Sequence, residues 1–153
     1  MKVFKDRGIT LIELAVSMAI ISILALAILP LSKISTKRAK ELELREHLRI
    51  IRDGIDEYKK LVDQGKIEKD SGDSGYPKNL QVLVEGVDLK QAVLEKKKFL
   101  RRIPRDSMTE DGEWGLRSYF DEPDSEIWGG EDVYDVYSKS EGTALDGTKY
   151  NTW

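Results

Sequence analysis

The chain has 153 residues, of which 35% are charged, and a net charge of −3, which fits one small domain with an additional apolar segment. It has no cysteine, which excludes disulfide bonds, thiol catalysis and cysteine metal sites. Residues 33–105 hold 19 Lys and Arg against 13 Asp and Glu, whereas residues 106–153 hold 3 against 13. The acidic end argues against nucleic acid as the main partner. The charge split fits either contacts between copies of the chain or a solvated surface.

A basic N-terminal segment precedes a long apolar run. Residues 1–8 carry three basic residues, and residues 14–31 carry no charge. At about 1.5 Å per residue, residues 9–31 span roughly 34 Å as a helix, enough to cross a bilayer core. No small-x-small cleavage site follows the run, so we expect it to stay with the mature protein as a single membrane-spanning helix. The first cations favour a cytoplasmic amino end, although those after the run favour the opposite orientation.

Glu13 lies one helical turn inside this apolar run. A carboxylate near a membrane centre costs about 2.5 kcal/mol or more, and less near the interface. Two interpretations stay open: a side chain that reaches the membrane edge, or a carboxylate kept for a partner cation.

The string GITLIE at residues 8–13, after a short basic leader and before the apolar run, resembles the class III signal of type IV pilins and type II secretion pseudopilins. The resemblance implies that a prepilin peptidase cuts between Gly8 and Ile9 and then methylates the new amino group of Ile9. It places the family's glutamate at Glu13 and its helix-breaking proline at Pro30.

The new α-amino group of Ile9 would be a cation, able to pair with Glu13 of a neighbouring copy in a low-dielectric core. Such a pair sets register better than it adds stability. We therefore expect Glu13 to fix the axial step between adjacent subunits. At Pro30, which lacks a donor and clashes with the preceding turn, we expect a kink or local melting over residues 27–30.

Helical periodicity resumes after the proline. Apolar residues recur at spacings of 4, 3, 4, 3 and 4, in the order Leu44, Leu48, Ile51, Ile55, Tyr58 and Val62. This stripe predicts an amphipathic helix over residues 32–63 that packs the domain core rather than presenting a free partner-binding face. Residues 64–105 read as a glycine-containing loop and a turn at Tyr76-Pro77 followed by a short helix. The basic stretch at residues 96–105 fits lipid headgroups, an acidic neighbour or plain solvation.

Residues 106–153 change to a β pattern. Residues 113–119 and 133–137 read as strands, with turn residues between them, and an antiparallel sheet of two or three strands would cover the apolar face of the helix. The expected fold is α+β and pilin-like, with a long N-terminal transmembrane and spine helix packed against a small C-terminal antiparallel sheet. Its parts are a leader (1–8), a transmembrane and polymerisation helix (9–31) and a periplasmic globular domain (32–153).

The Tyr-Pro turn followed by the string LQVLV at residues 80–84 is similar to the segment after the long helix in the major, G-type, pseudopilin. That resemblance implies a calcium ion in the loop after the last strand. Hard oxygen ligands on a glycine-containing loop suit Ca²⁺, although the spacing is not that of an EF-hand. The candidate ligands are Ser138, Ser140, Glu141 and Asp146. The loop departs from the family in having fewer aspartates and Lys149 near its end, where this lysine would satisfy an acid directly.

Catalysis is not expected, because the single histidine, His47, lies in the charged helix and no glycine-rich phosphate loop follows a strand. The expected function is that of a structural subunit of a periplasmic pseudopilus that drives export in type II secretion. The alternatives are a type IV pilus pilin, serving adhesion, motility or DNA uptake, and a membrane-tethered binding or catalytic domain. The expected partners are copies of the chain, minor pseudopilins, the prepilin peptidase, an inner-membrane assembly platform and inner-membrane lipid. The chain would cross the bacterial inner membrane once, with its C-terminal domain in the periplasm and assembled into a filament.

Overall fold

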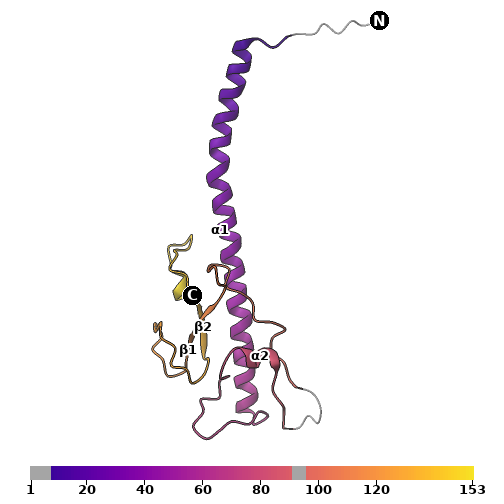
Figure 1. The fold of residues 1–153 in the computed structure, drawn as a ribbon, viewed down its shortest axis with the longest axis vertical. Coiled ribbons are helices and arrows are strands. Elements are labelled where there is room, and N and C mark those ends of the chain that lie inside the picture. The colour runs from indigo at the N-terminus through magenta and orange to yellow at the C-terminus, as the bar shows by residue number, and fades with distance from the viewer. Residues whose placement is uncertain (1–7, 91–95) are drawn as a thin grey trace, which may run out of the picture. The chain divides into compact units, whose positions relative to one another are not determined.

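A computed structural model describes residues 8–90 and 96–153, with the side chains of residues 26–31 outside the description. By its contacts the chain divides after Arg38 into an N-terminal unit and a C-terminal unit that begins at Ala39. The first unit is helical, and the second holds all the remaining secondary structure (Figure 1).

Helix α1 spans Leu11–Asp63, and its C-terminal end lies where the apolar stripe predicts it. Gly65 follows with a positive φ of 69°, and its N–H donates to the Val62 carbonyl at 2.8 Å. The N–H of Lys66 donates to the Leu61 carbonyl at 3.0 Å. These two bonds form a Schellman motif, which satisfies the last carbonyls of the helix and stops it.

Pro30 does not interrupt α1, so the local melting expected over residues 27–30 was wrong. A proline removes one N–H from the helix, and the hydrogen bonds of the neighbouring turns remain. Leu29 and Leu31, which favour helix, flank the proline directly. A kink without loss of helix stays a prediction.

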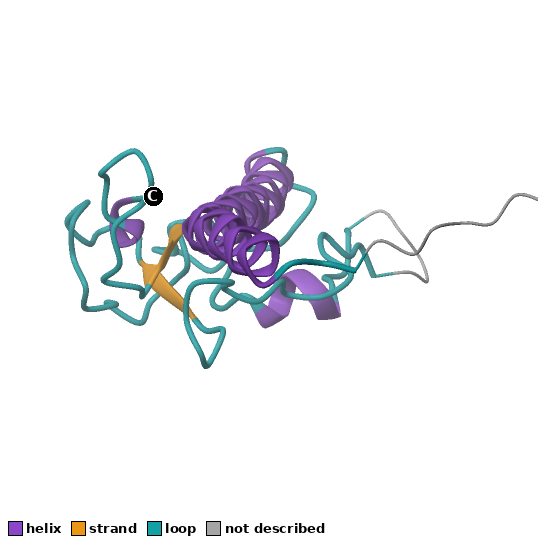
Figure 2. Ribbon diagram, turned by 90° about the horizontal axis from the view of Figure 1, so that it is seen from above, coloured by secondary structure: helices purple, strands orange, loops and turns teal. Residues whose placement is uncertain are grey.

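The other elements are short: helix α2 at Gln81–Glu85, strands β1 at Trp114–Arg117 and β2 at Asp135–Ser138, and a 3₁₀ helix, η1, at Tyr150–Thr152. The strands pair antiparallel, with Trp114 opposite Ser138 and Arg117 opposite Asp135. The predicted antiparallel sheet, for which two or three strands were expected, is therefore confirmed, and in the described residues it has two strands, shorter than the pattern suggested. Val133, for example, donates its N–H to the Pro77 carbonyl at 2.7 Å instead of joining the ladder. Figure 2 shows α2 and the two strands on different sides of α1.

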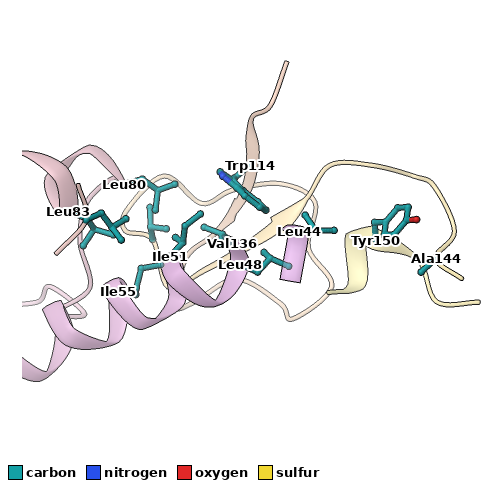
Figure 3. Packing of buried hydrophobic residues seen from close by; sticks show 12 residues of the cluster. Leu44, Leu48, Ile51, Ile55, Leu80, Leu83, Trp114, Val136, Ala144 and Tyr150 are labelled. Carbon is teal, nitrogen blue, oxygen red and sulfur yellow. The ribbon is translucent and has the colours of Figure 1, made fainter. Parts of the chain in front are cut away.

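The apolar stripe of α1 is the centre of the hydrophobic core. Its members Leu44, Ile51 and Ile55 are almost completely buried and belong to one cluster with Leu83 of α2 and Val136 of β2 (Figure 3). The stripe is therefore core, as predicted. The α+β, pilin-like fold, in which a long helix packs against a small antiparallel sheet, is confirmed.

Gly54 explains how the basic stretch reaches the helix. A Cβ atom at this position would lie 3.3 Å from the side chain of Leu100, and Leu100 is buried in the core cluster. A glycine inside a helix costs about 1 kcal/mol relative to alanine. Here it lets Leu100 pack directly on the helix backbone.

Two neighbouring isoleucines provide a test of the core. Ile51 has no exposed surface, whereas Ile50 is 37% exposed. Ile51→Ala should lower the free energy of unfolding by about 2–5 kcal/mol, because it leaves a cavity in the core. Ile50→Ala should cost less than about 1 kcal/mol. Urea denaturation of the detergent-solubilised full chain measures both values, and equal losses for the two variants would contradict this description of the core.

Candidate functional site

The N-terminal motif forms the beginning of α1. Thr10 precedes the helix, and its Oγ1 accepts a hydrogen bond from the backbone N–H of Glu13 at 3.3 Å. The Thr10 carbonyl accepts the first helical bond, from the N–H of Leu14, at 3.0 Å. Thr10 is thus the N-cap residue, and Glu13 occupies the third helical position, where an acid suits the positive end of the helix dipole. The Thr-x-x-Glu capping pattern was readable in the sequence and was not used in predicting the site.

Gly8 lies just before this cap and is exposed. A Cβ added to it would meet no described atom within 4 Å. Packing against the described residues therefore does not require glycine at residue 8, and its role in processing stays a prediction. Residues 1–7 of the predicted leader lie outside the described residues.

The first turns of α1 expose aliphatic side chains in every direction. Ile9 is 74% exposed and Leu11 86%, and eight further aliphatic or methionine side chains between residues 12 and 24 are more than half exposed. A helix that is apolar all round needs an apolar environment, either a core made by other helices or a membrane. This exposed segment, residues 9–25, is called the apolar rod below.

Polar groups of the apolar rod are satisfied within the helix. Ser17 donates its hydroxyl to the Glu13 carbonyl at 2.7 Å, and Ser22 donates to the Met18 carbonyl at 2.8 Å. Such bonds to the carbonyl four residues earlier remove the cost of placing a hydroxyl in an apolar environment. The Glu13 carboxylate differs, because no described residue forms an ion pair or a side-chain hydrogen bond with it.

The predicted membrane-spanning segment, residues 9–31, coincides with the first part of α1, which begins at Leu11. The segment includes residues 26–31, whose side chains are not described. Of the helices in the described part of the chain, none is both long enough and apolar enough to cross a membrane.

Asp146, one of the predicted calcium ligands, already contacts protein donors. Its Oδ2 lies 3.0 Å from the guanidinium of Arg45 on α1. Its Oδ1 accepts bonds from the backbone N–H and the hydroxyl of Thr148, at 3.0 and 2.6 Å. The hydrogen bonds from Thr148 are the main cause that lowers the pKa of Asp146, with the charge of Arg45 contributing further.

The hydroxyl groups of two other predicted ligands, Ser138 and Ser140, form hydrogen bonds within the protein. Ser138 is fully buried and donates its hydroxyl to Asp106 at 2.6 Å. The Ser140 hydroxyl accepts from a backbone N–H, that of Gly142, at 3.4 Å. Lys149 donates to the backbone carbonyl of Glu141 at 3.1 Å, rather than to the carboxylate that the sequence suggested.

The donor set of this loop does not fit a calcium ion. Hard cations take several oxygen ligands that converge on one point, whereas two cationic side chains, Arg45 and Lys149, contact the oxygens of the loop. Across residues 8–90 and 96–153, no three acidic or histidine side chains lie close enough to hold a metal ion. Calcium binding stays a prediction without support from the geometry.

A buried hydrogen bond fixes the same loop to α1. Glu41 is buried, and its Oε1 accepts from the Leu145 N–H and from the Tyr150 hydroxyl, both at 2.8 Å. Burial first, and then the bond to Glu41, raise the pKa of Tyr150 to about 12. Sequence patterns could not find this contact, because its partners lie more than 100 positions apart.

His47 is half-buried, and its Nδ1–H donates to the Arg105 carbonyl at 2.8 Å. It therefore attaches the basic stretch to α1. This structural contact accounts for the residue without any proton-transfer role.

Residues 4–29 match the protein family described as the prokaryotic N-terminal methylation motif. No curated protein and no solved structure matches the chain. The match confirms the predicted resemblance to type IV pilin-like prepilins for this N-terminal region. It is shared by pilus and secretion subunits, and the roles assigned to Gly8, Ile9 and Glu13 stay predictions.

Tyr150 makes the stability of the domain change with pH in the alkaline range. Its folded-state pKa lies above the ordinary value of 10.0, so the neutral phenol stabilises the fold fully below about pH 10. That contribution is lost as the pH rises from about 10 through 12. Tyr150→Phe should lower stability at pH 7 by about 1–2 kcal/mol and should weaken the fall in stability between pH 10 and 12. Thermal unfolding across this range measures the effect, and an unchanged alkaline profile in the variant would contradict it.

Removing divalent cations should leave the domain unchanged, because Arg45 and Lys149 contact the loop oxygens directly. The melting temperature of the full chain should be the same with EDTA, with no addition and with excess Ca²⁺. A fall in EDTA that Ca²⁺ reverses would show that the loop rearranges to hold the ion.

Proposed function

We propose that this chain is a filament subunit of the type IV pilin-like class, acting as a major-type subunit of a type II secretion pseudopilus. Its role is mechanical: copies add to a helical bundle that grows from the inner membrane and moves exported proteins outward. The apolar rod anchors each copy in the membrane before assembly and packs against neighbouring rods afterwards. The match at residues 4–29 supports the pilin-like part of this proposal.

The observation that carries the proposal is a lone carboxylate on an otherwise apolar helix surface. Glu13 has no described partner, and the residues around it expose aliphatic groups on all sides. Packing such helices together would bury Glu13, and a buried carboxylate needs a cation. Cleavage after Gly8 supplies one at the right place, the α-amino group of Ile9 in an adjacent copy.

A pilus subunit is the second candidate. The missing cysteines argue against pilins that close a C-terminal loop with a disulfide. The Tyr76-Pro77 turn followed by α2 at Gln81–Glu85 has the order of elements that favours the secretion subunit. Both candidates are structural proteins, and we assign no enzymatic reaction to the chain.

Calcium is not part of the proposed function. The loop oxygens of the C-terminal domain would instead contact the side chains of Arg45 and Lys149. The domain would lie in the periplasm, joined to the membrane anchor. Minor subunits, the prepilin peptidase and an inner-membrane assembly platform are the further partners that the proposal requires.

Glu13→Val should abolish filaments while leaving membrane insertion and leader removal intact. The substitution leaves the Ile9 amine of a neighbouring copy buried without a partner, at a cost of about 3–5 kcal/mol, which lowers affinity by roughly 10²–10³-fold. Glu43→Val is the matched control, since Glu43 is an exposed acid of the same helix in the C-terminal unit. Electron microscopy of cells that overexpress each variant counts the filaments, and mass spectrometry gives the mature amino terminus.

Filaments of normal number from Glu13→Val would contradict the role of Glu13. A mature chain that keeps residues 1–8 and forms no filaments would favour a permanently tethered domain instead. A methylated Ile9 amino terminus would exclude that third possibility.

A further inference from the structure

We propose that the C-terminal unit carries a second subunit–subunit contact, in which an acidic aromatic patch receives the basic segment of a neighbouring copy. The acidic aromatic patch consists of Tyr76, Tyr119, Phe120, Tyr134, Glu122 and Glu131. The basic segment is residues 96–102. The inference rests on the proposed filament, because it requires copies held side by side.

The patch contains an exposed group of aromatic rings. Phe120 is 71% exposed, Tyr119 52% and Tyr134 47%, all high values for large side chains. Tyr119 contacts Tyr76, Phe120 and Tyr134, with ring centroids 5.6, 5.2 and 5.6 Å apart. Exposed aromatic residues that cluster rather than scatter indicate an interaction site.

One buried carboxylate forms hydrogen bonds with the loops that carry the rings. Asp132 is 4% exposed, and its Oδ1 accepts from the Ser118 hydroxyl at 2.8 Å and the Tyr119 N–H at 2.9 Å. Its Oδ2 accepts from the hydroxyl of Ser74. Three loops that carry the rings therefore share one anchor, so little conformational entropy is lost when a partner binds.

Negative charge borders the rings. Glu131 and Tyr76 line the same polar cavity of about 370 Å³, which Lys78 also lines, and Glu122 lies two residues after Phe120. Lys59 lies 5.5 Å from the centroid of the Tyr76 ring, so the rings offered to a partner are those of Tyr119, Phe120 and Tyr134. Neither glutamate forms an ion pair or a side-chain hydrogen bond with any described residue. Aromatic faces next to free carboxylates are the environment that binds a guanidinium best, through cation–π contact and charge-assisted hydrogen bonds.

The basic segment supplies such groups. Lys96, Lys98, Arg101 and Arg102 are exposed, and within residues 8–90 and 96–153 none of them has an ion pair or a side-chain hydrogen bond. Their backbone is fixed, because the N–H groups of Phe99 and Leu100 both donate to the Leu83 carbonyl at 2.9 Å. The segment thus presents its cations from a firm support next to α2.

The two surfaces do not use each other within one copy. The basic segment pairs with the α2 region, whereas the patch surrounds the ends of β1 and β2, and Figure 1 shows α2 and the strands on different sides of α1. A second copy is therefore the occupant that the charges favour, since each copy brings both complementary surfaces. In a filament the high local concentration of neighbours makes even a weak contact of this kind effective.

Cross-linking tests this contact in the full chain. The protein has no cysteine, so Phe120→Cys combined with Arg102→Cys gives one defined pair for a short bismaleimide. Cells making this variant should show a ladder of dimers and larger multimers. The control combines Phe120→Cys with Lys66→Cys, an exposed lysine outside both surfaces, and should give at most about a tenth of that ladder, the ratio that corresponds to 1.4 kcal/mol.

Charge reversal separates this contact from other roles of the basic segment. On a background carrying Phe120→Cys and Lys98→Cys, Arg101→Glu with Arg102→Glu should lower the ladder about tenfold, and adding Glu122→Lys with Glu131→Lys should restore it. Lys60→Glu with Lys66→Glu, which changes the net charge equally, should leave it unchanged. Loss without restoration would assign the basic segment to another partner, such as lipid headgroups, and would overturn the proposal.

Counting filaments in the same cells distinguishes failure of the proposed contact from failure of the proposed function. Normal filaments without specific cross-links overturn the contact and leave the proposed function standing. Absence of filaments from the unmodified chain, with its leader retained, overturns both.

Discussion

Burial of one face of α1 is the constraint on which the C-terminal unit depends. The other regular elements of the described chain are five residues or shorter, so none could form without the helix. Leu44, Ile51 and Ile55 supply the apolar surface against which they pack. Arg52, at the edge of that surface, donates to the carboxylate of Asp135 and to the carbonyls of Val136 and Trp153. One helix face therefore positions both the sheet and the C-terminal segment.

Periodic features of the fold were predictable, and features made by single long-range contacts were not. The stripe from Leu44 to Val62 gave the helix and its end, because burial on one face imposes a repeat that the sequence displays. The loops carry no such repeat. Glu41, Asp106 and Asp132 are buried acids that hold these loops through backbone N–H and hydroxyl donors, and nothing in the local sequence separates them from surface acids.

The candidate sites also differ in whether they depend on a local string of residues or on long-range contacts. The N-terminal motif is a continuous string of residues, so its resemblance to the prepilin signal could be read from the sequence, and the family match over residues 4–29 supports that resemblance. The calcium prediction stays a prediction, because it depends on how a loop closes in space, where Arg45 reaches Asp146 from α1, 101 positions away. A ligand set inferred from composition could not include a competing cation supplied by another element.

The hydroxyl bonds of Ser17 and Ser22 have a mechanical consequence for the filament we propose. Because both hydroxyls donate to carbonyls of their own helix, neither has a proton left to donate to the next rod at these positions. Neighbouring rods could then shift along their axes with little change in their apolar contacts, until the Glu13 carboxylate meets the Ile9 amine of the next copy. In such a bundle the ion pair of Glu13 would favour one axial position for each subunit, and an added subunit would move past other positions until that ion pair forms.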